Sequence, residues 1–237
     1  MLTIRQTGTI MSTEAALYRL MTWLSPSYPL GAFSYSHGLE YAVEMGMVRD
    51  RQGLQDWAAT VVAAGAGRSD GALLAAAWRA ANAEDHAALD EIAALAAAWR
   101  GTAEMALESR AQGAAFLATT RMVWPHVLLD ALAARHRDEV ALPVVVGVAA
   151  AAHGVPLAAT LAAYLLAFAA TIVSAGVRLI PLGQSDGQRV IAALEGVIAA
   201  AAADILATPL AETGTAAPLV DWCSMRHETQ YTRLFRS

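Results

Sequence analysis

The chain has 237 residues, of which 57% are hydrophobic and only 16% are charged, and its formal net charge is −5 at pH 7. This acidic balance, without a basic stripe, excludes a nucleic-acid-binding surface, and the single cysteine, Cys223, excludes an internal disulfide and a thiolate metal cluster. The chain contains no lysine, so it cannot carry the phosphate-binding loop GxxxxGK[ST] of a P-loop NTPase.

The N-terminal residues 1–12 contain no apolar core of the kind that a signal peptide needs. We therefore expect a flexible N-terminus over residues 1–12 and a cytoplasmic protein. The charged fraction is well below the roughly 25% of an ordinary soluble domain, which predicts that part of the apolar surface meets another protein.

Apolar residues recur at three- and four-residue spacing along most of the chain, which predicts helices, and strand signals are nearly absent. Ser12 or Thr13 can cap a first helix that Ser25-Pro26 ends. The loop LSPSYPLGAFSYSHGLE (24–40) follows, with apolar side chains that either pack on the core or bind a partner. A short helix is predicted to end at Gly46, and the next helix to begin after Asp50. Further helices are predicted over 70–81, 84–98 and 102–121. Two more are predicted to begin at Pro125, ending at about Arg137, and at Pro143.

The segment from Pro156 to Arg178 holds no charge between Leu157 and Val177. A helix that is apolar on every side is either the centre of a large core or a membrane span. Alanine dominates the segment, and alanine contributes little to membrane insertion. We therefore expect a buried central helix over 156–178, with a small α-helical membrane protein built on 157–177 as the alternative.

After this segment, PLGQSDGQ predicts a turn, and Ser185 with Gln188 forms a capping-box pair that starts a helix to about Leu206. The sequence thus predicts an all-α protein, a single compact bundle of about ten helices around residues 156–178. The expected divisions are a flexible N-terminus over 1–12, a helical domain over 13–210, and a region with a linker, a short helix and a partner-binding tail over 211–237.

The search for chemistry finds little. Cys223 and His227 could share a helix face, but two ligands do not make a metal site. Ser34 lies near His37, but no nucleophile elbow or oxyanion loop accompanies them. We therefore predict that the chain is not an enzyme, and that it has no catalytic residue, no metal site and no cofactor of its own.

The tail is rich in arginine and aromatic residues, which dominate interface energetics. These residues are Arg226, Tyr231, Arg233, Phe235 and Arg236. They either bind a partner or fold back on the core, and we expect the tail to be mobile in the isolated protein. Arg178 is a lone cation at the end of the apolar segment, near Gln184 and Asp186, where it either contacts a partner or interacts with the helix dipole.

Three blocks of the sequence carry a resemblance to a known family. They are LSPSYPLGAFSYSHGLE (24–40), TIVSAGVRLIPLGQSDGQ (171–188) and SMRHETQYTRLFRS (224–237). In order and spacing they resemble the signature regions of the urease accessory protein F family, over nearly the whole chain. Where relatives commonly have Gly-Gly before the phenylalanine, this chain has Gly31-Ala32, which puts in question any contact that needs a positive φ at position 32.

The resemblance implies a non-catalytic all-α homodimer in the cytoplasm. It would bridge accessory protein D (called H in some bacteria) and the GTPase accessory protein G, modulate the GTPase and help to insert nickel into apo-urease, with no nucleic acid or membrane involved. By the same resemblance, the tail residues named above bind protein D/H, while Arg178, Gln184 and Asp186 face the GTPase. The loop motif consists of Pro29, Gly31, Phe33, Ser34, Tyr35, His37 and Glu40.

Overall fold

The protein is all-α in a computed structural model that describes residues 12–136 and 139–237. Of the predicted flexible N-terminus, residues 1–11 lie outside the described part, as does Arg137 at the predicted end of one helix. No strand occurs in the described ranges. The helices are α1 (Thr13–Trp23), α2 (Leu39–Glu44), α3 (Arg51–Ala63), α4 (Ala66–Asn82), α5 (His86–Ala98), α6 (Ala103–Val123), α7 (Val127–His136), α8 (Leu142–Ala152), α9 (Leu157–Leu179), α10 (Gln184–Ala193), α11 (Glu195–Ala207) and α12 (Pro218–His227), with the 3-10 turns η1 (Ala32–Ser34) and η2 (Leu210–Glu212).

Side-chain caps explain several of the helix starts. Ser12 accepts a hydrogen bond from the amide of Ala15 at the start of α1, and Asp50 accepts one from Gly53 at the start of α3. Asp85 and Thr102 cap α5 and α6 in the same way. Such a cap satisfies one of the amides that the first turn of a helix leaves without a partner. The predicted starts at Ser12 and Asp50 are therefore confirmed.

The centre of the core is the pair formed by α4 and α8. Every residue of α8 from Pro143 to Ala150 is buried, and α8 packs more extensively on α4 than any other two helices pack on each other. Gly147 makes this approach possible, because a Cβ atom at that position would lie 2.5 Å from the carbonyl oxygen of Leu74. Only glycine fits between the two backbones.

Helix α9 covers the predicted apolar segment, but only part of its surface is buried. One face, which includes Leu161, Tyr164 and Ile172, is buried and packs against α3, α4, α10 and α11. The opposite face, which includes Ala162 and Leu166, is exposed. The expectation that the bundle is organised around this segment is not confirmed, because α8 is the helix buried on nearly all sides.

Helix α9 also has the length and apolar composition of a membrane span, with 39% of its most apolar window buried inside the protein. A core helix of a soluble protein often has the same composition, so one helix of this kind is weak support for the membrane alternative.

The predicted helix from Ser185 to Leu206 is instead two helices. Helix α10 begins one residue earlier, after Gly183, and its first residue receives no side-chain cap. A break at Leu194 separates α10 from α11 with a bend of 41°. The capping box at Ser185 and Gln188 is therefore wrong.

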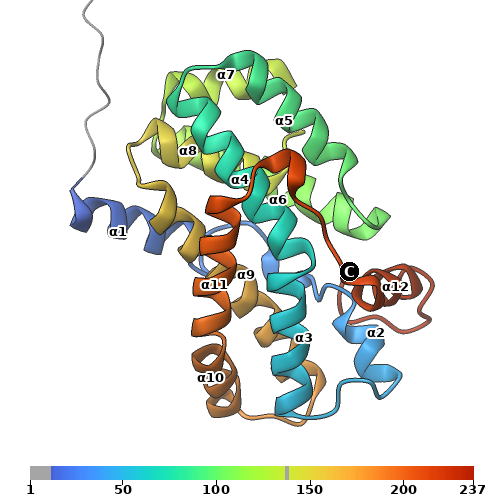
Figure 1. The fold of residues 1–237 in the computed structure, drawn as a ribbon. Coiled ribbons are helices and arrows are strands. Elements are labelled where there is room, and N and C mark those ends of the chain that lie inside the picture. The colour runs from blue at the N-terminus through green and yellow to red at the C-terminus, as the bar shows by residue number, and fades with distance from the viewer. Residues whose placement is uncertain (1–11, 137–138) are drawn as a thin grey trace, which may run out of the picture.

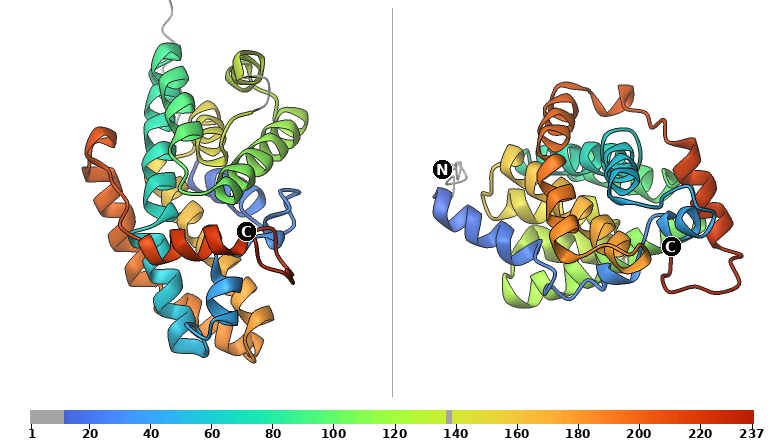
Figure 2. Two further views of the ribbon diagram at one scale, coloured as in Figure 1. Left: turned by 90° about the vertical axis from the view of Figure 1, so that its right-hand side faces the viewer. Right: turned by 90° about the horizontal axis from the view of Figure 1, so that it is seen from below.

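Figure 1 shows α5 and α7 at one end of the molecule, and α10 with the start of α3 at the other. Helix α12 lies beside α2, with which it is in contact, and the C-terminus comes back to the same place. Figure 2 shows this return from two further directions. The segment after α12 loops out and then turns back onto the protein.

Candidate functional site

The three sequence blocks that are far apart in the chain meet on one surface. The segment after α12, residues 228–237, is called the tail below, and it runs alongside the loop between α1 and α2. The amide of Arg236 donates to the carbonyl oxygen of Ser34 at 2.7 Å. The amide of Ser36 donates to the carbonyl oxygen of Ser237 at 2.8 Å. The first and third blocks are thus joined by backbone hydrogen bonds.

Glu40 holds the tail in place from the first turn of α2. Its carboxylate accepts hydrogen bonds from the amides of Leu234 (2.6 Å) and Phe235 (2.9 Å). The side chain is 8% exposed. A buried carboxylate that receives backbone N–H groups is a strong, directional acceptor. The predicted loop residue Glu40 is therefore a clamp on the tail backbone.

Gly38 allows α12 to approach the loop. It has a positive φ of 73°, and a Cβ atom there would lie 2.8 Å from the amide nitrogen of Ser224 on α12. Both the left-handed backbone and the close contact require glycine. This places the last turn of α12, and with it His227, directly against Glu40.

His227 is fully buried and joins two carboxylates. One ring nitrogen, Nδ1, lies 2.8 Å from Glu104 of α6, and the other, Nε2, lies 3.0 Å from Glu40. Arg233 of the tail donates to the second oxygen of Glu104 at 2.8 Å. Burial raises the pKa of Glu104, and the hydrogen bond from His227 opposes that shift. The result is a connected polar network under the tail.

His37 belongs to a second buried pair in the same region. Its Nε2 atom lies 3.1 Å from Glu108 of α6, which also accepts a hydrogen bond from the hydroxyl of Ser237 (3.1 Å). Burial lowers the pKa of His37, but the charge and hydrogen bond of Glu108 outweigh it, and the net pKa is raised. His37 thus bonds Glu108, and the considered pairing with Ser34 as nucleophile and base does not occur in the structure.

Arg178, at the end of α9, brings the second block to this surface. Its Nη2 atom donates to the carbonyl oxygen of Phe33 at 2.8 Å, and its guanidinium group lies 4.4 Å from the centre of the Phe235 ring. The predicted neighbour Asp186 instead binds Arg189 at 2.8 Å on α10. The structure therefore joins Arg178 to the loop and the tail, and Gln184 and Asp186 lie on α10 beyond the turn.

The expectation of a mobile tail is wrong. Phe235 is only 4% exposed, so it fills a pocket of its own chain, and Arg233 pairs with Glu104 of its own chain. Tyr231 is fully exposed and Leu234 is 65% exposed. The alternative, a tail folded back on its core, is what the structure shows, with one side buried and the other free.

The remaining predicted residues divide between core and surface. Tyr35 is buried, whereas Phe33 is 67% exposed. Gly31 has the positive φ of the turn (69°), and Ala32 simply begins η1, so this loop conformation places no positive φ at position 32. Pro29 and Arg236 are exposed. Arg226 lies 6.0 Å from the ring centre of Tyr41.

Glu104 and Glu108 are not among the residues predicted from the sequence. Both are buried carboxylates, four residues apart on α6. That spacing places them on one helix face, and the first turn also carries the cap Thr102. Acidic residues repeated on a face otherwise directed at the core are a signal for a buried polar network, and this signal was present in the sequence.

Metal ligation finds no support at Cys223 and His227. Burial raises the pKa of the Cys223 thiol to about 11, so the thiolate that binds metals is disfavoured. Both ring nitrogens of His227 are engaged with carboxylates. Across residues 12–136 and 139–237, no group of three or more His, Cys, Asp or Glu side chains is arranged to hold a metal ion.

Comparison with known proteins decides the family. The family model UreF matches residues 48–195. A urease accessory protein UreF from Granulibacter bethesdensis is 58% identical over 94% of this chain and 95% of its own length. The chain belongs to the UreF family of urease accessory proteins. Proteins with the same name from Magnetococcus marinus (48% identical, 96% of this chain and 100% of the relative) and Azorhizobium caulinodans (49% identical, 100% of both chains) agree.

Membership confirms the resemblance seen in the three sequence blocks. A UreF-family chain is an accessory protein and not an enzyme, as the sequence predicts. The family model itself ends at residue 195 and begins at residue 48, so it includes neither the loop nor the tail. The relative from Azorhizobium caulinodans, which matches over the whole length of this chain, does include them.

Proposed function

We propose that this chain is a non-catalytic adaptor of urease maturation. It bridges accessory protein D/H and the GTPase accessory protein G, modulates the GTPase, and so promotes the insertion of nickel into apo-urease. Nickel is cargo of the assembled complex, and the chain carries no cofactor of its own. It acts as a soluble homodimer in the cytoplasm, without contact to nucleic acid or a membrane.

The observation that carries this proposal is the composite surface of loop, tail and α9 end. Its buried side is held by Glu40, His227 and Glu104. Its free side presents Tyr231 and Leu234, together with the exposed ring of Phe33 in the loop. Exposed aromatic and apolar residues on a rigid support are the usual composition of an interface hot spot. We assign the exposed tail side of this surface to accessory protein D/H.

The surface proposed for the GTPase lies at the turn between α9 and α10. Arg178 is bound to the loop, so its reach is short, whereas Asp186 on α10 is partly exposed and paired with Arg189 and Arg51. A cation held by its own chain is better suited to support a docking surface than to enter a partner's active site. We therefore propose that Arg178, Gln184 and Asp186 hold the GTPase and do not contact its nucleotide.

The experiment that tests the adaptor proposal uses the exposed side of the tail. The double variant Tyr231→Ala with Leu234→Ala removes two side chains that are exposed, so folding should be unchanged. Two hot-spot side chains together should weaken binding of accessory protein D/H by roughly 30- to 1000-fold. Pull-down with purified protein D/H and urease activity in cells measure the effect.

The matched control is Met122→Ala, which truncates a side chain that is 77% exposed at the end of α6. It should leave binding and urease activity unchanged. Equal binding by the tail variant and the control would show that protein D/H docks elsewhere. Loss of urease activity with binding intact would contradict a pure docking role for the tail.

A further inference from the structure

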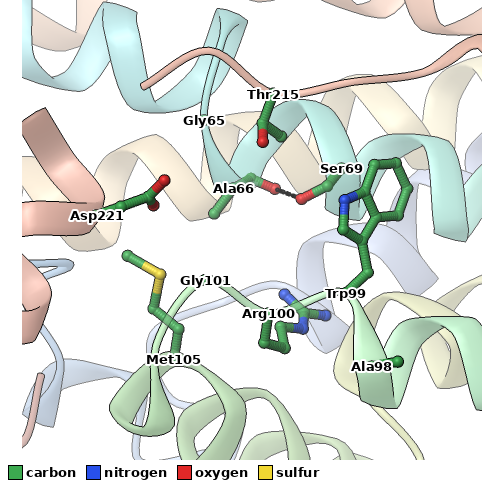
Figure 3. Close-up of a pocket in the computed structure, with 10 residues that line it drawn as sticks. All are labelled: Gly65, Ala66, Ser69, Ala98, Trp99, Arg100, Gly101, Met105, Thr215 and Asp221. Carbon is green, nitrogen blue, oxygen red and sulfur yellow. Dashed lines mark hydrogen bonds between the residues drawn. The ribbon is translucent and has the colours of Figure 1, made fainter. Parts of the chain in front are cut away.

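A cavity of about 170 Å³ lies between the start of α4, the segment that joins α5 to α6, and the segment that leads into α12. Figure 3 shows the guanidinium group of Arg100 pointing into this space, with Ala66 and Ser69 of α4 on the far side and Asp221 at one end. A water needs only about 10–15 Å³ of volume measured in this way. The cavity therefore has room for a small organic ion.

Arg100 lines the cavity, and two of its three guanidinium nitrogens lack a hydrogen-bond partner in the described part of the chain. Its side chain is only 7% exposed, and its Nη1 atom donates to Asp70 at 2.5 Å. The Nε and Nη2 atoms are buried and have no hydrogen-bond partner in the described part of the chain. These two nitrogens form one side of the guanidinium fork, and that side binds the two oxygens of a carboxylate.

The same fork is occupied elsewhere in this protein. Nε of Arg135 donates to one oxygen of Asp90 at 2.9 Å, and its Nη2 donates to the other oxygen. This pair shows what the free edge of Arg100 is shaped to accept. Arg135 lies on the surface, whereas Arg100 is buried, so an empty fork at Arg100 has a much larger cost.

The carboxylates near Arg100 are engaged with other groups. Asp70 accepts the hydroxyl of Tyr164 at 2.9 Å with its second oxygen. Glu108 binds His37, Gln112 and Ser237. Neither bonds the Nε or Nη2 atom of Arg100. No side chain in the described part of the chain therefore occupies this edge.

The opposite wall of the cavity also favours an anion. It is the N-terminus of α4, a helix of 17 residues whose N-cap, Gly65, offers no side-chain hydrogen bond. The first amides of a helix carry a partial positive charge and attract carboxylate or phosphate oxygens. The N-terminus of a helix and the guanidinium group of a buried arginine thus line one small space.

Asp221 sets the chemistry of the far end. It lies so close to Gly101 that a Cβ atom there would be 3.0 Å from its Oδ1 atom. Its carboxylate has no hydrogen-bond or ion-pair partner among the described residues, and burial raises its pKa. The carboxylate of Asp221 would repel a negatively charged group at this end of the cavity and would accept a hydrogen bond from a donor.

We propose that this cavity binds a small carboxylate that carries a hydrogen-bond donor on the side away from its two oxygens. The two oxygens bind the free edge of Arg100 and the first turn of α4, and the donor binds Asp221. Bicarbonate, with its hydroxyl, and a small α-amino acid such as glycine, with its ammonium group, both have this arrangement. Acetate has the two oxygens without the donor, and sulfate brings a second negative charge towards Asp221.

Calorimetric titration of the full-length chain with bicarbonate, glycine, acetate and sulfate tests the proposal. We expect saturable binding of bicarbonate or glycine, with weaker binding of acetate and none of sulfate. The comparison of bicarbonate with glycine identifies which of the two is the better ligand. Failure of both to bind would overturn the proposal.

Two matched variants test the role of the fork. Arg100→Lys keeps the charge and the pairing with Asp70 but removes the edge, so it should weaken binding roughly 10- to 100-fold. Arg135→Lys makes the same change outside the cavity and should leave binding unchanged. Equal affinity of the two variants would overturn the assignment to Arg100.

Two further variants keep the test valid if Arg100→Lys fails to fold. Asp221→Ala should weaken glycine and bicarbonate but not acetate, because only the first two have the donor. Thr215→Trp places a large ring at the exposed rim of the cavity and should weaken all ligands. If affinities for glycine, bicarbonate and acetate stayed as in the wild type in both variants, binding would lie outside this cavity.

Discussion

At the scale of single residues, the most consequential side chain is a carboxylate on a short helix. Glu40 receives two tail amides and the ring of His227. Removal of one partner from a buried charged network costs about 3–5 kcal/mol, because the remaining groups lose their compensation. Glu40, which the sequence places in the loop motif, thus holds the tail to the rest of the protein.

Two histidines give the stability of the protein opposite pH dependences. The pKa of His37 is raised, with Glu108, Asp70 and Arg100 as the charged groups that act on it. Protonated His37 therefore stabilises the folded protein fully at pH values below its unfolded-state pKa of about 6.5. This stabilisation is lost as the pH rises through the higher pKa that His37 has in the folded state. Burial and the charge of Arg19 lower the pKa of His153 to about 4, so stability is lost as the pH falls from 6.5 towards 4.

We predict that the free energy of unfolding of His37→Asn does not fall above pH 6.5, as it does in the wild type. Asparagine tolerates the positive φ of 54° at this position, so the backbone should be kept. At pH 6 the variant should be less stable by about 1.5–3 kcal/mol, the contribution of a hydrogen bond to a charged group. Urea unfolding between pH 6 and pH 9 measures the change. The control is His153→Asn, which should change the pH dependence of stability only below pH 6.5. If stability still fell above pH 6.5 in His37→Asn as it does in the wild type, His37 would not be the group responsible.

At the scale of elements, the tail is a structural segment and not a loose end. It has no helix or strand of its own, yet Phe235 is buried and its backbone is bonded to the loop and to Glu40. A segment without regular structure can be ordered in this way when buried side chains of other elements satisfy its amides. Its stability therefore depends on α2, α6 and α12 together.

We predict that deletion from Thr229 onward destabilises the protein. The deletion exposes the Phe235 pocket and leaves Glu40 without two of its donors, which should cost about 3–5 kcal/mol. For a chain of this length the melting temperature should fall by roughly 6–20 °C. Thermal unfolding followed by circular dichroism measures it, with Tyr231→Ala as the control that should melt like the wild type. A deletion variant with an unchanged melting temperature would show that the tail does not pack on the core in solution.

At the scale of the whole molecule, apolar surface is abundant. Large apolar side chains are exposed on α1, including Leu17, Tyr18 and Met21, and α9 has an uncharged outer face. Exposed apolar side chains in this number favour contact with another protein surface. This is consistent with the low charged content of the chain.

We predict that the purified protein is a dimer in the absence of detergent. The apolar faces should be covered by a second copy, and light scattering at several concentrations should give twice the mass of 24.8 kDa. Circular dichroism should show a mainly helical protein. Fractionation with membranes, or a requirement for detergent, would instead favour the membrane alternative for α9.

The sequence by itself determined the helical class, the limits of most helices and the family. Periodicity and caps at Ser12 and Asp50 act within one or two turns, so they can be seen in the chain without knowledge of the fold. The three sequence blocks that resemble the family could also be identified from the sequence. Their positions along the chain did not indicate that they lie together in the fold.

Only the tertiary structure decided which helix is central and how the tail lies. Alanine-rich α8 and α9 look alike in sequence, but close packing on α4 and α6 buries nearly all of α8, whereas α9 is open on one side. The partners of Glu40 lie more than 180 residues away in the chain. Contacts of that separation depend on how helices pack, and no local pattern of residues specifies them.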